Sequence, residues 1–86
     1  MSKLDEARVK INKIDEEMAK LFEERMKAAT EVAEYKLEHG LPIFDSSREK
    51  EVINNNLKHI SNEIIKEYYV NFLNNTMTLS KQYQSR

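Results

Sequence analysis

Arg25 interrupts an apolar seam that runs through the N-terminal half of the sequence. The seam residues recur at spacings of three and four, which is typical of one helix face; they are Leu4, Ala7, Ile11, Ile14, Met18, Leu21, Ala28, Val32 and Tyr35. Lys36 follows Arg25 by eleven residues, which is about 20° around a helix and ~16 Å along its axis. Two long cationic side chains at this spacing can converge on an anionic ligand between them. The ordinary alternative is an arginine that packs its stem and extends its head to water.

Other polar side chains continue this pattern later in the chain. Arg48 and Glu49 lie near the start of a second helix, while Ser80 and Gln84 extend the apolar stripe of a third helix with polar atoms. Each has an ordinary interpretation as surface charge, helix cap or frayed terminus, and Asp45 can be a turn or N-cap residue. Together they describe a helical interior lined by cationic, acidic, hydroxyl and amide groups. Such an interior requires a polar, anionic ligand.

Arg8 stands apart from the other candidates. It lies beside the seam but ~42 Å along the helix axis from Lys36, so one straight helix cannot bring both to one ligand. An antiparallel partner helix could deliver Arg8 of a second chain to the site. Otherwise Arg8 is an exposed arginine on the first turns.

The composition predicts an all-α chain. Its 86 residues contain one glycine and one proline, and the charged share of 34% suits exposed helix faces. We predict a single domain over residues 1–86, with one long helix at about 3–39 and a loop at 40–46. Two shorter helices follow at about 47–60 and 63–84.

Local signals set these boundaries. Gly40 and Pro42 predict the end of the first helix. Ser46 and Glu49 match the S-x-x-E capping box, which would open the second helix.

The length of the first helix predicts a homodimer. A helix of about 36 residues spans ~54 Å, whereas a compact chain of this size has a diameter of only about 30 Å. The remaining residues cannot cover the seam, so pairing of two long helices in an intertwined homodimer is expected.

Several classes of function lack support in the sequence. The net charge is −1, with 14 basic and 15 acidic residues interspersed, which argues against nucleic acid as a partner. No run of eighteen apolar residues or leader is present, so neither a membrane span nor a secretory signal is predicted. There is no cysteine, and His39 and His59 lack a third metal ligand at suitable spacing. We expect no metal, no cofactor and no covalent catalysis, because no nucleophile motif is present.

The chain resembles the AroQ-class chorismate mutases, which are all-α homodimers, and especially the mutase domain of bifunctional chorismate mutase–prephenate dehydratases. Three segments carry the resemblance, and they are ARVKINKIDEEMAKLFEERMKAATEVAEYK, LPIFDSSREKEV and LSKQYQ. The resemblance covers nearly the whole chain. It fits a free-standing enzyme as well as a domain of a bifunctional one.

The resemblance implies which residues bind the substrate carboxylates. Arg25 and Arg48 would hold carboxylates within the chain, and Arg8 would reach the partner's site across the dimer. Ser80 would assist a carboxylate.

The resemblance also implies which residues act on the remaining groups of the substrate. Lys36 and Gln84 would face each other across the ether oxygen whose bond breaks. Glu49, with the backbone near Asp45, would bind the ring hydroxyl.

The position of the third helix leaves one alternative open. Thr76 and Ser80 have the same four-residue spacing as Ser80 and Gln84. We prefer the second pair, because SKQYQ is similar to the family's S-x-x-x-Q ending.

The implied function is the Claisen rearrangement of chorismate to prephenate, an isomerase reaction of the shikimate-derived pathway to phenylalanine and tyrosine in the cytoplasm. The arginine forks would bind the dianion and preorganise it, and the ether-oxygen donors would stabilise developing charge. Two alternatives remain. One is an isochorismate-pyruvate lyase on the same fold, and the other is a non-enzymatic helical dimerisation module whose polar seam residues set the register.

Overall fold

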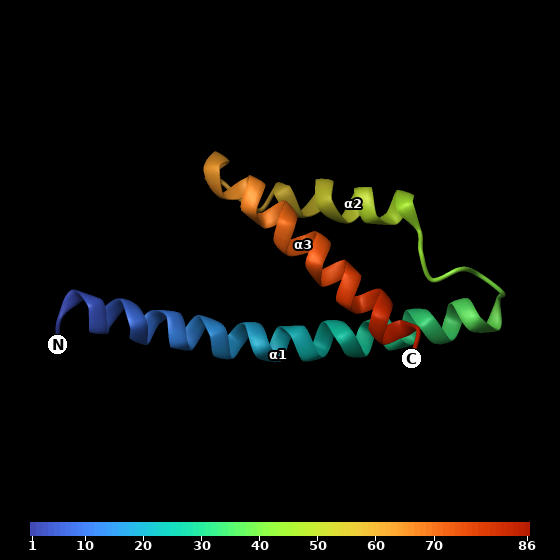
Figure 1. Cartoon of the computed structure of the whole chain (residues 1–86), viewed down its shortest axis with the longest axis horizontal. Coiled ribbons are helices and arrows are strands. Elements are labelled where there is room, and N and C mark those ends of the chain that lie inside the picture. The colour runs from blue at the N-terminus through green and yellow to red at the C-terminus, as the bar shows by residue number, and fades with distance from the viewer.

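The computed structural model describes all residues from 1 to 86 and contains three helices without any strand. They are α1 at Lys3–Glu38, α2 at Ser46–Leu57 and α3 at Glu63–Gln84 (Figure 1). The predicted all-α class with one long and two shorter helices is confirmed. None of the three helices combines the length and apolarity needed to cross a membrane.

Local capping explains where α1 begins and ends. At its start, the hydroxyl of Ser2 accepts a hydrogen bond from Asp5 N at 3.1 Å, and the Asp5 carboxylate accepts one from Ser2 N at 3.3 Å. At its end, Gly40 adopts a φ of +64°, a left-handed conformation that glycine reaches without steric cost. Leu41 N then donates to Lys36 O at 2.8 Å, which turns the chain out of the helix.

The predicted capping box at the start of α2 is wrong. Asp45 is the N-cap, and its side chain accepts a hydrogen bond from Arg48 N at 3.0 Å. Ser46 is therefore the first helical residue, one position inside the helix that it was expected to cap. Both an Asp and a Ser can cap a helix, and the carboxylate occupies the position that satisfies the free N–H group. The Glu49 side chain is consequently available for other contacts.

α2 is also shorter than predicted, because it ends at Leu57 rather than near residue 60. Two tight turns follow, in which His59 N donates to Asn56 O at 3.0 Å and Ile60 N donates to Leu57 O at 3.1 Å. Asn62 then caps α3, where its side chain accepts from Ile64 N at 2.9 Å. Asn62 has the extended backbone typical of an N-cap, so the chain leaves the helical conformation before this residue.

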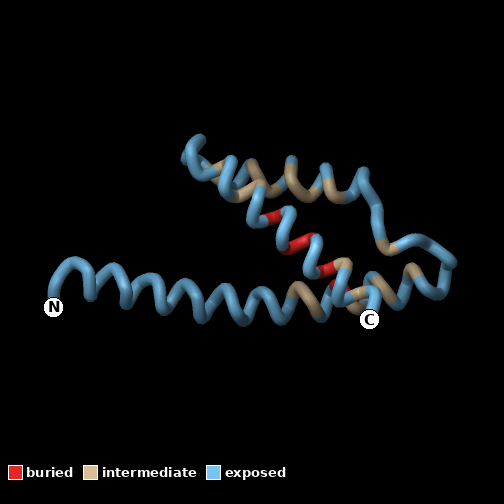
Figure 2. Tube along the Cα trace, in the orientation of Figure 1, coloured by how far each residue is buried: buried red, intermediate tan, exposed pale blue.

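α3 packs against both other helices, whereas the backbones of α1 and α2 do not approach each other closely. α2 lies apart from α1, and α3 returns from the end of α2 to the C-terminal half of α1 (Figure 1). The buried residues form a short row along α3 and one position on α1 (Figure 2); they are Leu73, Thr76, Met77, Ser80 and Ala29. The core is small and joins the end of α3 to the second half of α1.

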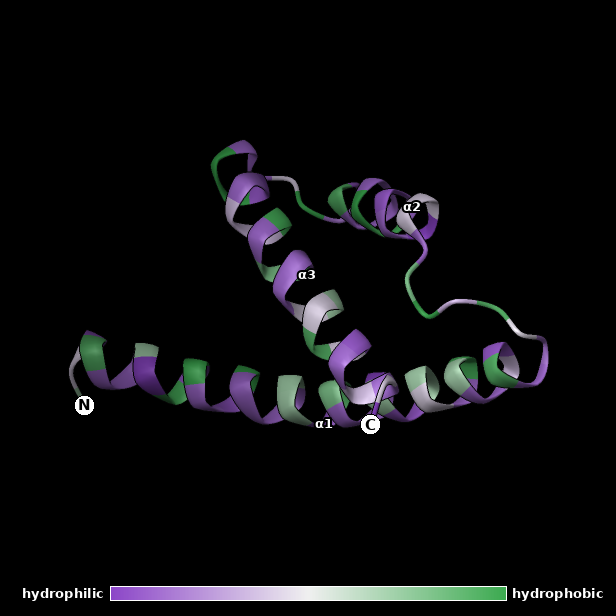
Figure 3. Cartoon of the chain, turned by 45° about the vertical axis from the view of Figure 1, so that its right-hand side comes forward, coloured by the Kyte–Doolittle hydropathy of each residue, from purple (hydrophilic) through white to green (hydrophobic).

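The N-terminal half of α1 extends away from this core. Every residue from 3 to 24 is exposed in the chain, including the predicted apolar seam from Leu4 to Leu21. Hydrophobic and hydrophilic residues alternate along the ribbon of this part of the helix, and no other element of the chain lies beside it (Figure 3). The radius of gyration is 16.1 Å, compared with about 12 Å for a compact chain of this length. The single chain thus leaves its longest apolar seam uncovered.

Candidate functional site

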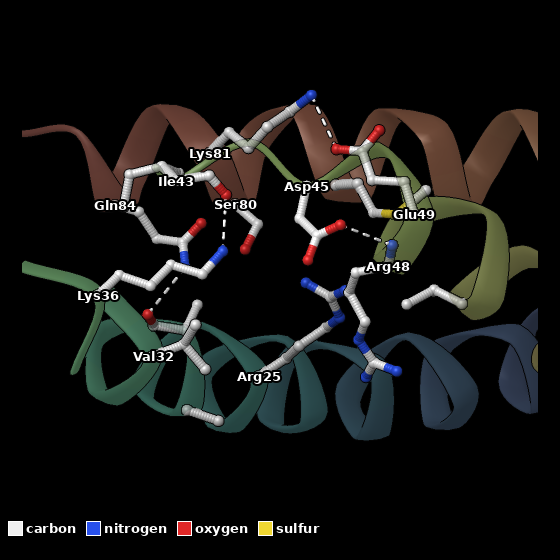
Figure 4. A pocket seen from close by; sticks show the side chains of 14 residues that line it. Arg25, Val32, Lys36, Ile43, Asp45, Arg48, Glu49, Ser80, Lys81 and Gln84 are labelled. Carbon is white, nitrogen blue, oxygen red and sulfur yellow. Dashed lines mark hydrogen bonds and ion pairs between the residues drawn. The ribbon is translucent and has the colours of Figure 1, made fainter. Parts of the chain in front are cut away.

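A pocket of about 280 Å³ lies where α1, the segment after it, α2 and α3 come together (Figure 4). Its polar and charged lining residues are Arg25, Lys36, Asp45, Arg48, Glu49, Ser80, Lys81 and Gln84. Its apolar walls are Ala28, Ala29, Val32, Ile43, Val52 and Met77. Every candidate residue of the sequence analysis lines this pocket except Arg8 and Thr76, the latter being part of the alternative pair on α3.

The helical period explains why one face of α1 supplies a wall of the pocket. Arg25, Ala28, Val32 and Lys36 are three or four residues apart, so they point to the same side of the helix. Arg25 and Lys36 enter the pocket towards opposite ends, with Val32 between them (Figure 4). The eleven-residue spacing of Arg25 and Lys36 thus separates the two cations along the pocket.

Lys36 and Gln84 are held side by side at one end of the pocket (Figure 4). Lys36 Nζ donates a hydrogen bond to Ile43 O at 2.8 Å, and Gln84 Nε2 donates to Ala29 O at 3.0 Å. An ammonium has three N–H donors and a side-chain amide has two. Each side chain is therefore anchored through one donor and retains at least one more for a ligand.

Arg25 and Arg48 approach the other end of the pocket. Arg25 is half-buried and forms no ion pair within the chain. Arg48 Nη1 pairs with Glu51 Oε1 at 2.7 Å, but both side chains are about 60% exposed, at 61% and 59%. Such an exposed pair is screened by water and contributes little stability. Both guanidinium groups can therefore turn to an incoming carboxylate at small cost.

Two carboxylates line the pocket on the side of α2. The Asp45 carboxylate caps α2 through Arg48 N. Glu49 Oε2 pairs with Lys81 Nζ at 2.9 Å, and the two side chains are 27% and 34% exposed. Lys81 is the one charged lining residue that the sequence analysis missed. Lys81 lies between Ser80 and Gln84 in the sequence, and this proximity to two candidate residues could have indicated that it lines the pocket.

The two candidate pairs on α3 differ in their relation to the pocket. Ser80 is buried and lines it together with Gln84. Thr76 is also buried, but its hydroxyl donates to Phe72 O at 2.8 Å, and it does not line the pocket. Ser80 and Gln84 are thus the pair that lines the cavity.

Arg8 is exposed on the free N-terminal half of α1 and lies outside the pocket. Twenty-eight residues of straight helix separate it from Lys36, which corresponds to ~42 Å. Within one chain, the site contains no contribution from Arg8.

The charges of the lining residues favour a doubly negative ligand. Four cations and two carboxylates leave a formal charge of +2; they are Arg25, Lys36, Arg48, Lys81, Asp45 and Glu49. Like charges held close together destabilise the empty pocket, and a dianion of matching size relieves that repulsion. Arginine forks are well suited to carboxylates, because they donate two parallel hydrogen bonds.

The sequence of the chain is similar to that of known proteins of one family. Residues 7–85 match the family described as chorismate mutase type II. A stretch of 50 residues is 48% identical to a chorismate mutase of Methanocaldococcus jannaschii, and it covers 58% of this chain and 50% of that protein. A stretch of 52 residues is 42% identical to a bifunctional chorismate mutase/prephenate dehydratase of Aquifex aeolicus, covering 60% of this chain and 14% of that protein. The matches thus span only half of the first relative and a small part of the second.

Proposed function

The chain belongs to the chorismate mutase type II family, and from this premise we propose that it converts chorismate to prephenate. The observation that carries the proposal is the pairing of Lys36 with Gln84 at one end of a cationic pocket, since each retains a free N–H donor. These donors suit a single ether oxygen that gains negative charge.

The reaction is an intramolecular rearrangement of one substrate. The C–O bond of the enolpyruvyl ether breaks while a C–C bond to the ring forms, and no atom leaves or enters. It requires no nucleophile, proton transfer or cofactor, so the protein acts by binding and by electrostatics. The lining residues of the pocket supply charged groups and hydrogen-bond donors and acceptors suited to both.

Arg25 and Arg48 bind the carboxylates in the proposed complex. Arg25 has no ion pair to give up, and the exposed Arg48–Glu51 pair is weak. Ser80 is buried and lines the same pocket, where it adds a hydroxyl donor. Holding both carboxylates folds the flexible enolpyruvyl group over the ring, which removes conformational freedom before the reaction.

Lys36 and Gln84 donate to the ether oxygen as its bond breaks. Negative charge on this oxygen is larger in the transition state than in the ground state, so the donors stabilise the transition state selectively. They are anchored in advance by Ile43 O and Ala29 O. Removal of one preorganised donor of this kind lowers the catalytic rate by about 10²–10³-fold.

Glu49 accepts the hydrogen bond of the ring hydroxyl in this proposal. Its Oε2 forms an ion pair with Lys81, and its Oε1 forms no ion pair in the chain. The backbone near Asp45 contributes to the same subsite at the start of α2.

A homodimer completes the site. The uncovered seam of α1 supports it, because seven large apolar side chains in the N-terminal half are exposed; they are Leu4, Val9, Ile11, Ile14, Met18, Leu21 and Phe22. Antiparallel pairing of two such helices brings Arg8 of one chain to the pocket of the other. Arg8 then adds a further cation beside a substrate carboxylate.

The corresponding cellular role is a cytoplasmic step in phenylalanine and tyrosine biosynthesis. We propose neither a nucleic-acid nor a membrane partner. The mixed charges of the chain, with a net of −1, offer no basic stripe for phosphate backbones or anionic headgroups.

The test is to add chorismate to the purified protein and identify the product by chromatography and mass. Prephenate without released pyruvate supports the proposal. Isochorismate is the second substrate to try, and pyruvate released from it would assign the fold to the lyase reaction instead. If neither substrate is consumed by a protein that remains helical and dimeric, the enzymatic proposal fails and a dimerisation module stands in its place.

A further inference from the structure

Lys81 connects three elements of the chain at the roof of the pocket. It extends from the end of α3, and its ammonium lies 2.9 Å from Glu49 Oε2 in the first turn of α2. The same ammonium lies 4.7 Å from the ring centroid of Phe44, in the segment between α1 and α2. This distance is within the range of a cation–π contact. Lys81 is therefore held from two sides.

The contact between Lys81 and Glu49 is more protected than the other ion pairs at the surface. About a third or less of each side chain is exposed, at 34% for Lys81 and 27% for Glu49. The pair between Arg48 and Glu51 exposes nearly twice as much. Partial burial reduces screening by water, so the pair between Lys81 and Glu49 constrains both side chains more strongly.

The geometry divides the two oxygens of Glu49 between two tasks. Lys81 forms an ion pair with Oε2, and the carboxylate lies at the upper rim of the pocket (Figure 4). Oε1 forms no ion pair within the chain, so its lone pairs remain available to an O–H donor. A carboxylate accepts through both oxygens and donates through neither while ionised, so Glu49 can serve Lys81 and a hydroxyl group at the same time.

The charge of Lys81 matters as well as its position. The formal charge of +2 on the lining residues includes Lys81, and its loss would leave the Glu49 charge uncompensated. An uncompensated carboxylate repels a dianionic ligand in the same small space.

We propose that Lys81 is a positioning residue of the pocket. It orients Glu49 for the ring hydroxyl of the substrate and offsets the negative charge of that carboxylate, without touching the substrate itself. This inference rests on the proposed mutase function. It assigns to Lys81 an effect on substrate affinity that is transmitted through Glu49.

The first measurement is the steady-state kinetics of K81M with chorismate. Methionine preserves the length and apolar stem of lysine but removes its charge. We expect KM to rise about tenfold, the scale of one charge-assisted hydrogen bond, while kcat changes less than about threefold, since the Glu49 contact is equal in the ground and transition states. K81R should recover most of the affinity, because it retains the cation.

Lys66 provides the matched control. It lies on the same helix, pairs with Glu63 at 2.9 Å, and its side chain is 33% exposed, but it is remote from the pocket. K66M removes an ion pair from the same helix, in which the lysine is exposed to the same extent but the Glu63 side chain is 82% exposed, and it should leave KM and kcat unchanged. A rise in KM with K66M equal to that with K81M would overturn the proposal, because loss of any α3 ion pair would then suffice.

A double-mutant cycle decides whether Lys81 acts through Glu49. In the E49Q background, K81M should change KM by less than about twofold, because residues that act as a unit are not additive. An undiminished effect in that background means that Lys81 binds the substrate directly, and the proposal is wrong. If K81M does not fold, as judged by circular dichroism, K81Q replaces it in the same cycle.

The wild-type protein separates this inference from the function on which it rests. No turnover of chorismate by the folded wild-type dimer rejects the mutase function. Turnover by the wild type together with an unchanged KM for K81M rejects the role of Lys81 alone.

Discussion

The side-chain amide of Gln84 donates a hydrogen bond to the main-chain carbonyl of Ala29 at 3.0 Å, across 55 residues of sequence. This bond ties the last turn of α3 to the middle of α1, and it fixes the amide beside Lys36 (Figure 4). A helix terminus that would otherwise fray is thereby held in place by a residue of the pocket itself. The same side chain contributes to the tertiary structure and to the proposed chemistry.

Replacing Gln84 by Glu should make the activity depend on pH. A glutamine amide donates at any pH, whereas a carboxyl group donates only when protonated, and its ordinary pKa is about 4.3. The kcat/KM of Gln84→Glu should therefore be low at neutral pH and rise as the pH falls, while the wild type shows no such rise.

Rate measurements between pH 5 and 8 check this, with Gln82→Glu as the control. Gln82 is exposed on the same helix and does not line the pocket. A wild-type rate that increases steeply towards acid would contradict the role of a neutral donor at position 84.

Replacing Lys36 by Ala should abolish turnover but leave the assembly intact. Lys36 supplies the charged donor to the ether oxygen, and removal of such a donor costs about 10²–10³ in kcat. Sedimentation velocity should show the same species for Lys36→Ala as for the wild type. Lys27→Ala changes an exposed lysine on the same helix that lies outside the pocket, and it should retain full activity. A change of oligomeric state in Lys36→Ala would favour a register module over an enzyme.

Mixing two inactive variants should restore activity if Arg8 acts across a dimer. Arg8→Ala and Lys36→Ala chains each lack one component, and every homodimer of either kind has two defective sites. A mixed dimer contains one complete site, so equal mixing after refolding should recover about a quarter of the wild-type activity for random pairing of chains in a two-fold dimer. No recovery, with exchange of chains demonstrated by mass, would show that Arg8 does not serve the partner's pocket.

A dianionic analogue of the substrate should stabilise the protein against heat. The empty pocket holds an excess of positive charge, and a ligand that binds only the folded state adds about 2.7 kcal/mol at 100 times its Kd. We expect the melting temperature to rise by several degrees in differential scanning calorimetry at low salt. Arg25→Ala should lose most of this rise. If the analogue left the melting temperature of the wild type unchanged, the positive charge of Arg25 in the seam would not be neutralised by a bound dianion.

Local patterns were sufficient for much of the architecture. The helical period placed Arg25 and Lys36 on one face of α1, and Gly40 marked the end of that helix, where the observed φ of +64° suits glycine. These features depend on residues a few positions apart. The one-residue error at the start of α2 arose because Asp45 and Ser46 are both good caps, and local preference alone does not choose between them.

The pairings between distant segments were decided by the tertiary structure. Glu49 meets Lys81, and Gln84 meets Ala29, only because α3 folds back across α1 and α2. The helical stripe alone did not determine how far α3 extends along its neighbours. A shift of α3 by one turn would move Ser80 into the place of Gln84 and would still keep the apolar stripe on the same face. A sequence pattern reports which face of a helix is apolar, but not how far along a neighbour that helix lies. That axial position depends on the turns between helices and on packing, and it determines which side chains share the pocket.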